Sequence, residues 1–244
     1  MPEGPSIVIL KEAVQLFVGK TVEAASGNSK QIAFDRIKGQ KIIAIKSFGK
    51  QLLICFKAFT VRIHLLMFGS YRINEAKEVS PRLHLQFKKG ELNFYACSVK
   101  MIEEDLDTIY DWTADVMNPL WDPAKAFEKL KSKKKLMVCD ALLDQNIFAG
   151  VGNIIKNEVL FRLKIHPESY VEKIPDKLLK TLVKEAVHYS FQFLEWKKEF
   201  VLRQHCLAHN KSVCPRDKVP FKRAYLGKTN RRSFYCTICQ QLYK

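Results

Sequence analysis

The chain has 244 residues, of which 41 are Lys or Arg and 25 are Asp or Glu, so its formal net charge is +16. Hydrophobic residues make up 47% of the sequence and aromatic residues 11%, which excludes a wholly disordered chain. No apolar run approaches the roughly 18 residues that a membrane span needs. Glu3 also stands where a signal peptide would carry positive charge. We therefore expect a soluble cytoplasmic protein, in a bacterial cytosol or nucleoid, with one large or two modest domains.

The excess of positive charge predicts an anionic partner. A compact, strongly basic domain is typical of a nucleic-acid binder. An anionic lipid surface is the alternative, but no amphipathic helix rich in Lys and Arg favours it. We therefore expect nucleic acid as the partner and no membrane association.

Residues 1–115 are predicted to form a leading helix followed by short strands. Apolar residues recur at helical spacing behind Pro5, at Ile7, Leu10, Val14 and Phe17. From about residue 21 to residue 101, short apolar runs are separated by Gly, Asn and Lys, as in an antiparallel sandwich or barrel. These runs are KIIAIKSF, QLLICF, VRIHLLMF, SYRI, LHLQF and LNFY.

Residues 116–204 are predicted to be helical. Asp122-Pro123 has the composition of a helix start, and helical spacing resumes from about Asp176 to Phe200. Between them, Phe148-Ala-Gly-Val-Gly-Asn153 precedes a further helix, whose first backbone amides could bind a phosphate. The alternative is that these glycines only turn the chain and that Asn153 only caps the helix.

The tail, residues 205–244, contains the spacing of a zinc site. Seven cysteines, an odd number, indicate a reducing compartment, and four of them lie in this tail. Cys214-Pro-Arg-Asp217 and Cys236-Thr-Ile-Cys239 resemble two zinc knuckles, with Asp217 in the place of one cysteine. Because carboxylate oxygen also binds zinc, we expect these four residues to hold one structural zinc ion.

This tail is too short for a hydrophobic core of its own, so a metal ion would brace it. His209 or Cys206 is an alternative fourth ligand, and a tail without metal is the simpler alternative. Arg231 and Arg232 lie between the knuckles, where they could reach phosphates from a hairpin tip or remain solvated surface charges.

The amino terminus carries a candidate nucleophile. Met1 before a small residue such as Pro2 is normally removed, which leaves a secondary amine that can attack a sugar carbon and form an iminium ion. An α-amino group titrates near pH 8, so a useful fraction is neutral at pH 7. Glu3 would then act beside it as an acid and base. The alternative is that PEGP is only a turn before a helix.

Five segments, in order, resemble one family. MPEGP, FGKQLL, HLLMFGS, DQNIFAGVGNIIKNEVLFRLKIHP and RRSFYCTICQ are similar to motifs of the formamidopyrimidine-DNA glycosylase/endonuclease VIII family of repair enzymes. The resemblance implies an α+β fold: an amino-terminal antiparallel β-sandwich with a leading helix, then a helix–two-turn–helix domain with a zinc-finger hairpin. It also implies a monomer that binds damaged double-stranded DNA between the two domains.

The resemblance implies a role for each matching residue. Pro2 would attack C1′ of the damaged nucleotide, Glu3 would protonate the sugar ring oxygen, and Lys50 would contact phosphate and assist catalysis. The strand would then be cut by β- and δ-elimination. Asn153 and Arg231 would hold the phosphates that flank the lesion while its nucleotide leaves the stack.

Leu66, Met67 and Phe68 match the place where the family fills the gap left by the rotated base. Their alternative is ordinary strand core. The stretch YACSVKMIEED lacks the Arg-x-Phe element of the formamidopyrimidine branch, which favours oxidised pyrimidines as substrates. The alternatives are a preference for formamidopyrimidines or oxidised purines, a catalytically silent DNA-binding relative, and an RNA-associated zinc protein.

Overall fold

The structure is a computed structural model that describes residues 2–244, so the expected removal of Met1 lies outside the described residues. The chain divides into two compact units, which meet in sequence at Tyr110 and Asp111. Unit 1 contains the chain up to Tyr110, and unit 2 is Asp111–Lys244. None of the described helices is long and apolar enough to cross a membrane.

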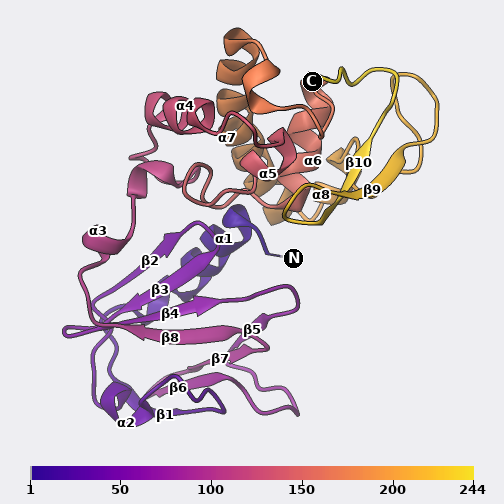
Figure 1. Cartoon of the computed structure of the whole chain (residues 1–244). Coiled ribbons are helices and arrows are strands. Elements are labelled where there is room, and N and C mark those ends of the chain that lie inside the picture. The colour runs from indigo at the N-terminus through magenta and orange to yellow at the C-terminus, as the bar shows by residue number, and fades with distance from the viewer. Residues whose placement is uncertain (1) are drawn as a thin grey trace. The chain divides into compact units, whose positions relative to one another are not determined.

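Unit 1 consists of two four-stranded antiparallel sheets and a leading helix (Figure 1). One sheet has the order β2-β3-β4-β8 and the other the order β1-β6-β7-β5. The strands are β1 (Val22–Ser26), β2 (Ala44–Phe48), β3 (Gln51–Cys55), β4 (Thr60–His64), β5 (Ser70–Ile73), β6 (Leu83–Phe87), β7 (Glu91–Tyr95) and β8 (Ser98–Ile102). The helices of this unit are α1 (Gly4–Val14), α2 (Phe34–Ile37) and α3 (Leu106–Ile109), with a 3₁₀ turn at Gln15–Phe17.

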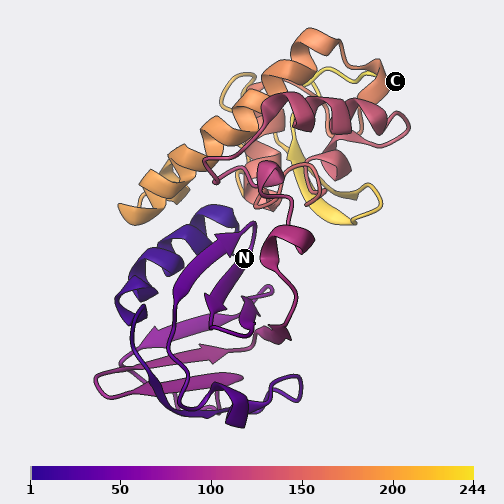
Figure 2. The ribbon, with the colours of Figure 1, turned by 90° about the vertical axis from the view of Figure 1, so that its left-hand side faces the viewer.

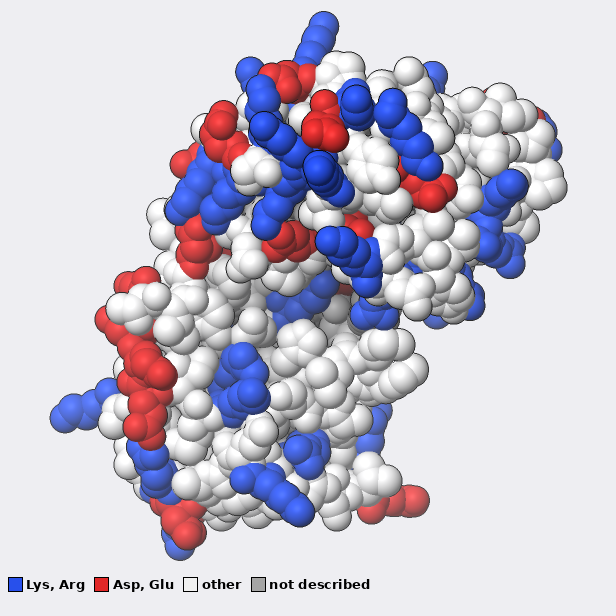
Figure 3. Space-filling model, viewed as in Figure 1, with Lys and Arg blue, Asp and Glu red and all other residues white. Residues whose placement is uncertain are grey.

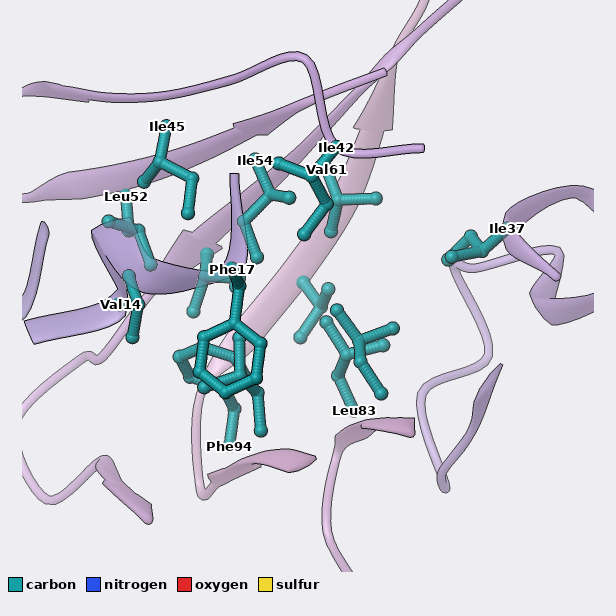
Figure 4. Close-up of a cluster of buried hydrophobic side chains, with 14 of the residues drawn as sticks. Val14, Phe17, Ile37, Ile42, Ile45, Leu52, Ile54, Val61, Leu83 and Phe94 are labelled. Atoms are coloured by element: carbon teal, nitrogen blue, oxygen red, sulfur yellow. The ribbon is translucent and has the colours of Figure 1, made fainter. Parts of the chain in front are cut away.

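The core of unit 1 lies between its sheets. In β6, Leu83, Leu85 and Phe87 are buried while the residues between them are half-buried, which is the alternation of a strand with one face on the core. Phe17 follows α1 and packs against Phe87, with ring centroids 4.6 Å apart. Figure 4 shows side chains from β2, β3 and β4 and others from β6 and β7 pointing toward one another around Phe17.

The leading helix belongs to the same core. Its apolar positions Ile7, Leu10 and Val14 are fully buried, and α1 packs against β2 and β3. In Figure 2 this indigo helix runs along one side of the strands. The amphipathic spacing therefore fixes Gly4–Val14 on the sandwich.

Unit 2 contains the remaining helices and a two-stranded hairpin. Asp122 caps α4 by accepting hydrogen bonds from the amides of Ala124 and Lys125, as expected for the pair with Pro123. The elements are α4 (Pro123–Ser132), α5 (Val138–Ala141), α6 (Asn153–Arg162), α7 (Asp176–Lys198), α8 (Leu202–His205), β9 (Lys222–Leu226) and β10 (Arg231–Tyr235), with 3₁₀ turns at Trp112–Ala114 and Val171–Lys173.

Helix α6 is the central element of unit 2. Every residue from Ile155 to Phe161 is buried, and the helix packs against α7 and β10. Phe161 at its end shares a buried cluster with Cys214, Phe221 and Cys236 of the tail. The tail, which the sequence predicts as a separate segment, thus shares a core with α6 and belongs to unit 2. The division after Tyr110 lies before the predicted boundary at residue 115.

Replacing Phe17 by Ala is expected to destabilise unit 1 by about 3–5 kcal/mol, because it removes a buried ring and leaves a cavity. Leu16→Ala is the matched control, since Leu16 is 54% exposed and should change stability by less than about 0.5 kcal/mol. The measurement is urea unfolding followed by circular dichroism. Tryptophan fluorescence reports unit 2 separately, because Trp112, Trp121 and Trp196 all lie there. Equal stability of the two variants would contradict the assignment of Phe17 to the core.

Candidate functional site

The amino terminus of the described chain leads directly into α1. Glu3 is the residue before the helix, and its carbonyl oxygen accepts hydrogen bonds from the amides of Ser6 at 2.8 Å and Ile7 at 3.3 Å. Its side chain is fully buried, and Pro2 is half-buried. Glu3 is therefore held immediately beside Pro2 by the backbone of the helix.

Lys50 lies in the two-residue turn between β2 and β3. Phe48 and Gln51 close this turn as a strand pair, and Gly49 has a φ of +54°. A positive φ at the first of two turn residues is typical of a type II′ hairpin, which favours glycine there. Because α1 packs against both strands, the turn is part of the same framework as Pro2 and Glu3.

His64, at the end of β4, lies beside this turn. It pairs with Gln51 in the sheet, and its pKa is lowered by burial and then by the positive charges of Lys50 and Arg62. Its Nδ1 atom accepts a hydrogen bond of 3.1 Å from the amide of Leu66. Neutral His64 therefore connects the Lys50 turn to the loop that follows β4.

That loop exposes three large apolar side chains. Leu66, Met67 and Phe68 have 48%, 47% and 84% of their surface exposed, so the alternative that they form strand core is wrong. The continuous apolar run suggested a strand to residue 68, but Leu66 has a φ of +53° and the strand ends at His64. The amide of Gly69 then returns to the carbonyl of Leu65 at 2.7 Å. A Cβ at Gly69 would lie 2.0 Å from that carbonyl oxygen, so this turn requires glycine.

In unit 2, polar side chains one helical turn apart connect α6 to β10. Asn153 is the first residue of α6, and its Nδ2 donates a 2.9 Å hydrogen bond to the carbonyl of Arg232. Lys156 donates to the hydroxyl of Ser233 at 2.8 Å. The i and i+3 positions face the same side of a helix, so both contacts reach one strand. The structure therefore brings Asn153 together with the residue that follows Arg231.

Two further residues of α6 extend these contacts, and sequence reasoning did not identify them. Asn157 accepts a 3.1 Å hydrogen bond from the amide of Phe234. Glu158 is fully buried, and its carboxylate accepts hydrogen bonds of 2.7–2.9 Å from the amides of the loop at 207–209. A buried charge needs such partners. Adjacent polar residues on a buried helix were the signal that the sequence offered for this role.

Four residues of the tail form a cluster suited to a metal ion. The ligand atoms of Cys214, Asp217, Cys236 and Cys239 all lie within 4.8 Å of one another. Sγ of Cys214 is 3.9 Å from Sγ of Cys239, and Oδ2 of Asp217 is 3.1 Å from Sγ of Cys236. Tetrahedral zinc with bonds of about 2.3 Å to sulfur would place sulfur atoms about 3.8 Å apart. The donor set and its spacing therefore fit a tetrahedral ion.

The alternative fourth ligands lie in other contacts. Nδ1 of His209 is 3.2 Å from Nδ2 of Asn157, and burial together with the charge of Lys156 lowers the pKa of His209 to about 4. The thiol of Cys206 contacts the carbonyl of Leu202 at 3.4 Å. Neither residue belongs to the four-residue cluster, so the geometry favours Asp217.

Arg216 attaches the first knuckle to α6. Its guanidinium donates to the carbonyl of Phe161 at 2.9 Å and lies 4.0 Å from the centre of the Phe161 ring. A cation at the carboxyl end of a helix is favoured by the helix dipole. The cluster is thus fixed to the same helix as Asn153.

Lys and Arg side chains are unevenly distributed over the surface. Figure 3 shows a dense group of them over α4, interspersed with acidic side chains. Lys125 and Lys129 both pair with Asp111, and Lys131 pairs with Asp176. Much of the positive charge over α4 is therefore locally compensated.

The sequence matches two domain models of one family. Residues 1–97 match the formamidopyrimidine-DNA glycosylase N-terminal domain, and residues 114–199 match the formamidopyrimidine-DNA glycosylase H2TH domain. These ranges correspond to most of unit 1 and to the part of unit 2 that contains α4 to α7.

Individual relatives agree with these matches. The chain is 31% identical to Endonuclease 8-like 3 of Bos taurus over 92% of its own length and 39% of the relative's. It is 27% identical to DNA-(apurinic or apyrimidinic site) lyase Nei2 of Mycolicibacterium smegmatis over 73% of each protein. The chain spans about two fifths of the length of the Endonuclease 8-like 3 proteins that it matches.

The fold of the chain is shared with solved structures. The crystal structure of Lactococcus lactis formamidopyrimidine-DNA glycosylase, non-covalently bound to DNA that contains an AP site, superimposes with a TM-score of 0.87 at 21% identity. The match covers 98% of this chain and 99% of that one. By its two domain matches, its relatives and its fold, the chain belongs to the formamidopyrimidine-DNA glycosylase/endonuclease VIII family.

Proposed function

We propose that the chain is a bifunctional DNA glycosylase and AP lyase of base-excision repair. The observation that carries the proposal is the amino terminus, where Pro2 precedes the buried carboxyl group of Glu3 at the start of α1. The names of the relatives, which include an AP lyase and several Endonuclease 8-like proteins, support it. Damaged double-stranded DNA is the proposed partner. The expectations of a monomer and of a bacterial cytoplasmic location stay predictions.

The chemistry begins at the amine of Pro2, once Met1 has been removed. The nitrogen attacks C1′ of the damaged nucleotide, the bond from C1′ to the base breaks, and the base leaves with the proton that the proline nitrogen gives up. Glu3 protonates the ring oxygen as the sugar opens, which yields an iminium ion at C1′. The iminium acidifies the proton on C2′, whose removal expels the 3′ phosphate by β-elimination. A second elimination expels the 5′ phosphate.

The DNA contacts are proposed for three places in the chain. Lys50 reaches a phosphate from its hairpin turn, and Asn153 and Arg231 hold the phosphates beside the lesion. Rotating a nucleotide out of the duplex costs stacking energy that such contacts offset. The exposed side chains of Leu66–Phe68 are suited to fill the gap, because wedge residues of this kind insert between bases.

Oxidised pyrimidines are the proposed substrates, with formamidopyrimidines or oxidised purines as the alternative. Only Ala96 and Cys97 connect β7 to β8, which leaves no room there for an inserted Arg-x-Phe loop. The Endonuclease 8-like names of the relatives also favour the pyrimidine branch.

The four-residue cluster is proposed to hold one structural zinc ion. Three thiolates and a carboxylate are zinc ligands, and the distances between these donor atoms fit a tetrahedron. When bound, the ion would brace the base of the β9–β10 hairpin, because Cys236 directly follows β10. It takes no part in the chemistry at Pro2.

Borohydride should trap a covalent complex with DNA through Pro2. The probes are duplexes carrying dihydrouracil, 8-oxoguanine, a formamidopyrimidine or an abasic site, and mass spectrometry should find the adduct on the peptide Pro2–Lys11. A residue retained ahead of Pro2 converts the amine to an amide and should abolish trapping, whereas the same extension at the carboxyl end should not. Stronger trapping on a purine lesion would overturn the pyrimidine preference. Intact duplex binding without any adduct would indicate a catalytically silent relative.

Glu3→Gln should separate the two half-reactions. Loss of the acid should slow base removal by about 10²- to 10⁴-fold, the usual contribution of general acid catalysis. The rate of cutting at a preformed abasic site should fall less, because no base has to leave the sugar there. Single-turnover rates on the two substrates measure the difference. An equal loss on both would contradict a role for Glu3 in base removal.

The purified protein should contain one zinc ion per chain by mass spectrometry of the metal. Cys236→Ser should lose the ion and destabilise unit 2, because metal binding contributes to folding. Asp217→Cys should retain it and bind it more tightly, since thiolate is the softer ligand. If the single variant Asp217→Ala retained zinc and the double variant Asp217→Ala/His209→Ala lost it, His209 would instead be identified as a ligand.

A further inference from the structure

The tip of the β9–β10 hairpin is held by a carboxylate from another part of unit 2. Asp140, in α5, is 5% exposed. Its Oδ2 accepts a 2.8 Å hydrogen bond from the amide of Lys228. Its Oδ1 accepts from the amide of Thr229 at 3.0 Å and from the hydroxyl of Thr229 at 2.7 Å. Three donors of one turn therefore converge on one buried carboxylate.

The turn is shaped around this carboxylate. Gly227 has a φ of +69°, and a Cβ there would lie 2.3 Å from Oδ2 of Asp140. Asn230 also has a positive φ, and its amide returns to the carbonyl of Gly227 at 3.3 Å. Glycine permits both the left-handed backbone and the close approach. The conformation of the tip is thus fitted to Asp140.

Asp140 is itself held by a rigid part of unit 2. The amide of Val138 bonds to the carbonyl of Ser169 at 2.8 Å, and that of Cys139 bonds to the carbonyl of Pro167 at 3.2 Å. Cys139 and Ala141, which flank Asp140 in the chain, are almost fully and fully buried. The hairpin tip is therefore bonded to the side chain of Asp140, and the backbone beside Asp140 is bonded in turn to Pro167 and Ser169.

Arg231 directly follows this turn. It is the first residue of β10 and pairs with Leu226, and the next carbonyl, of Arg232, accepts the hydrogen bond from Asn153. The four-residue cluster lies at the other end of the same strand, beyond Tyr235. The place where Arg231 leaves the hairpin is thus set by Asp140 on one side and by α6 on the other.

We propose that Asp140 is a positioning residue for the DNA contact of Arg231, which it sets by fixing the hairpin tip independently of the metal cluster. The inference rests on the proposed function, because Arg231 is a phosphate contact only there. Burying an ionised carboxylate is costly, and packing alone would be served as well by an apolar side chain. What this carboxylate supplies, and an apolar residue does not, is a single geometry for three donors.

The first experiment tests the tip without DNA. Trypsin can cut after Lys228, Arg231 and Arg232. Asp140→Asn places an amide donor against the amide of Lys228 and should speed cleavage at these sites by about tenfold or more, because local opening becomes easier. Asp176→Asn removes the same charge from an exposed ion pair with Lys131 and should not. Metal content should be unchanged in both variants. An unchanged cleavage rate in Asp140→Asn would overturn the inference.

The second experiment measures binding to a duplex with a tetrahydrofuran abasic-site analogue. Arg231→Ala should weaken binding by about tenfold to a hundredfold and lower the salt slope by about one phosphate contact. Asp140→Asn should produce a comparable loss and the same change in slope. The double variant should bind no worse than Arg231→Ala alone, because both substitutions remove one contact. Losses that multiply, or an unchanged salt slope, would show that Asp140 acts only through general stability.

A milder pair of variants guards against misfolding of Asp140→Asn. Thr229 is exposed, so Thr229→Ala removes one bond to Asp140 without disturbing the core. It should weaken binding in the same direction, and Thr229→Ser should restore it. Equal binding by the two variants would count against the inference. If the wild-type chain did not bind the duplex, the proposed function would fail, and the DNA role of Asp140 with it. If the wild-type chain bound the duplex and Asp140→Asn bound it equally well, only the inference about Asp140 would be contradicted.

Discussion

The burial of polar side chains along one face of α6 is the interaction on which unit 2 depends. Asn153, Lys156 and Asn157 all bond to β10, so the helix start and the hairpin form one rigid body. Lys156 is fully buried, and its ammonium group would be costly there without the Ser233 hydroxyl and its other partners. These contacts involve the carbonyl of Arg232, the hydroxyl of Ser233 and the amide of Phe234, which are successive residues of β10. Together they fix the register between the helix and the hairpin. That register brings Asn153 beside the backbone that carries Arg231.

Unit 1 holds the groups proposed to be catalytic, Pro2, Glu3 and Lys50, on a β-sandwich. Its first helix is fixed by three fully buried apolar residues, so the chain has no slack between Pro2 and the core. The Gly49–Lys50 turn and the loop after His64 are tight turns that allow little backbone freedom. Preorganised groups lose less entropy when substrate binds. The exposed side chains of Leu66–Phe68 are therefore presented by a loop whose backbone conformation is already fixed.

Local patterns in the sequence predicted what local physics determines. The helical spacing of Ile7, Leu10 and Val14 gave α1, and the cap at Asp122 gave the start of α4. The run VRIHLLMF did not show where its strand ends, because the limit comes from the close approach of Gly69 to Leu65. Asp140 could not be identified at all, since its partner Lys228 lies 88 residues away and no spacing rule connects them. The knuckle spacing located the four-residue cluster and Asp217 within it, but only the distances separate Asp217 from the alternatives His209 and Cys206.

The three amides that Glu158 accepts have a consequence for dissecting the molecule. They belong to the loop at 207–209, so a fragment ending at residue 204 would keep the carboxylate and lose all three donors. The same cut would take Ser233 away from the ammonium of Lys156. Lys156 and Glu158, which are fully buried in the whole chain, would then lose these hydrogen-bond partners. The hairpin is therefore not a detachable module, and shortened versions of this chain that remove it would also remove the interior of the helical unit.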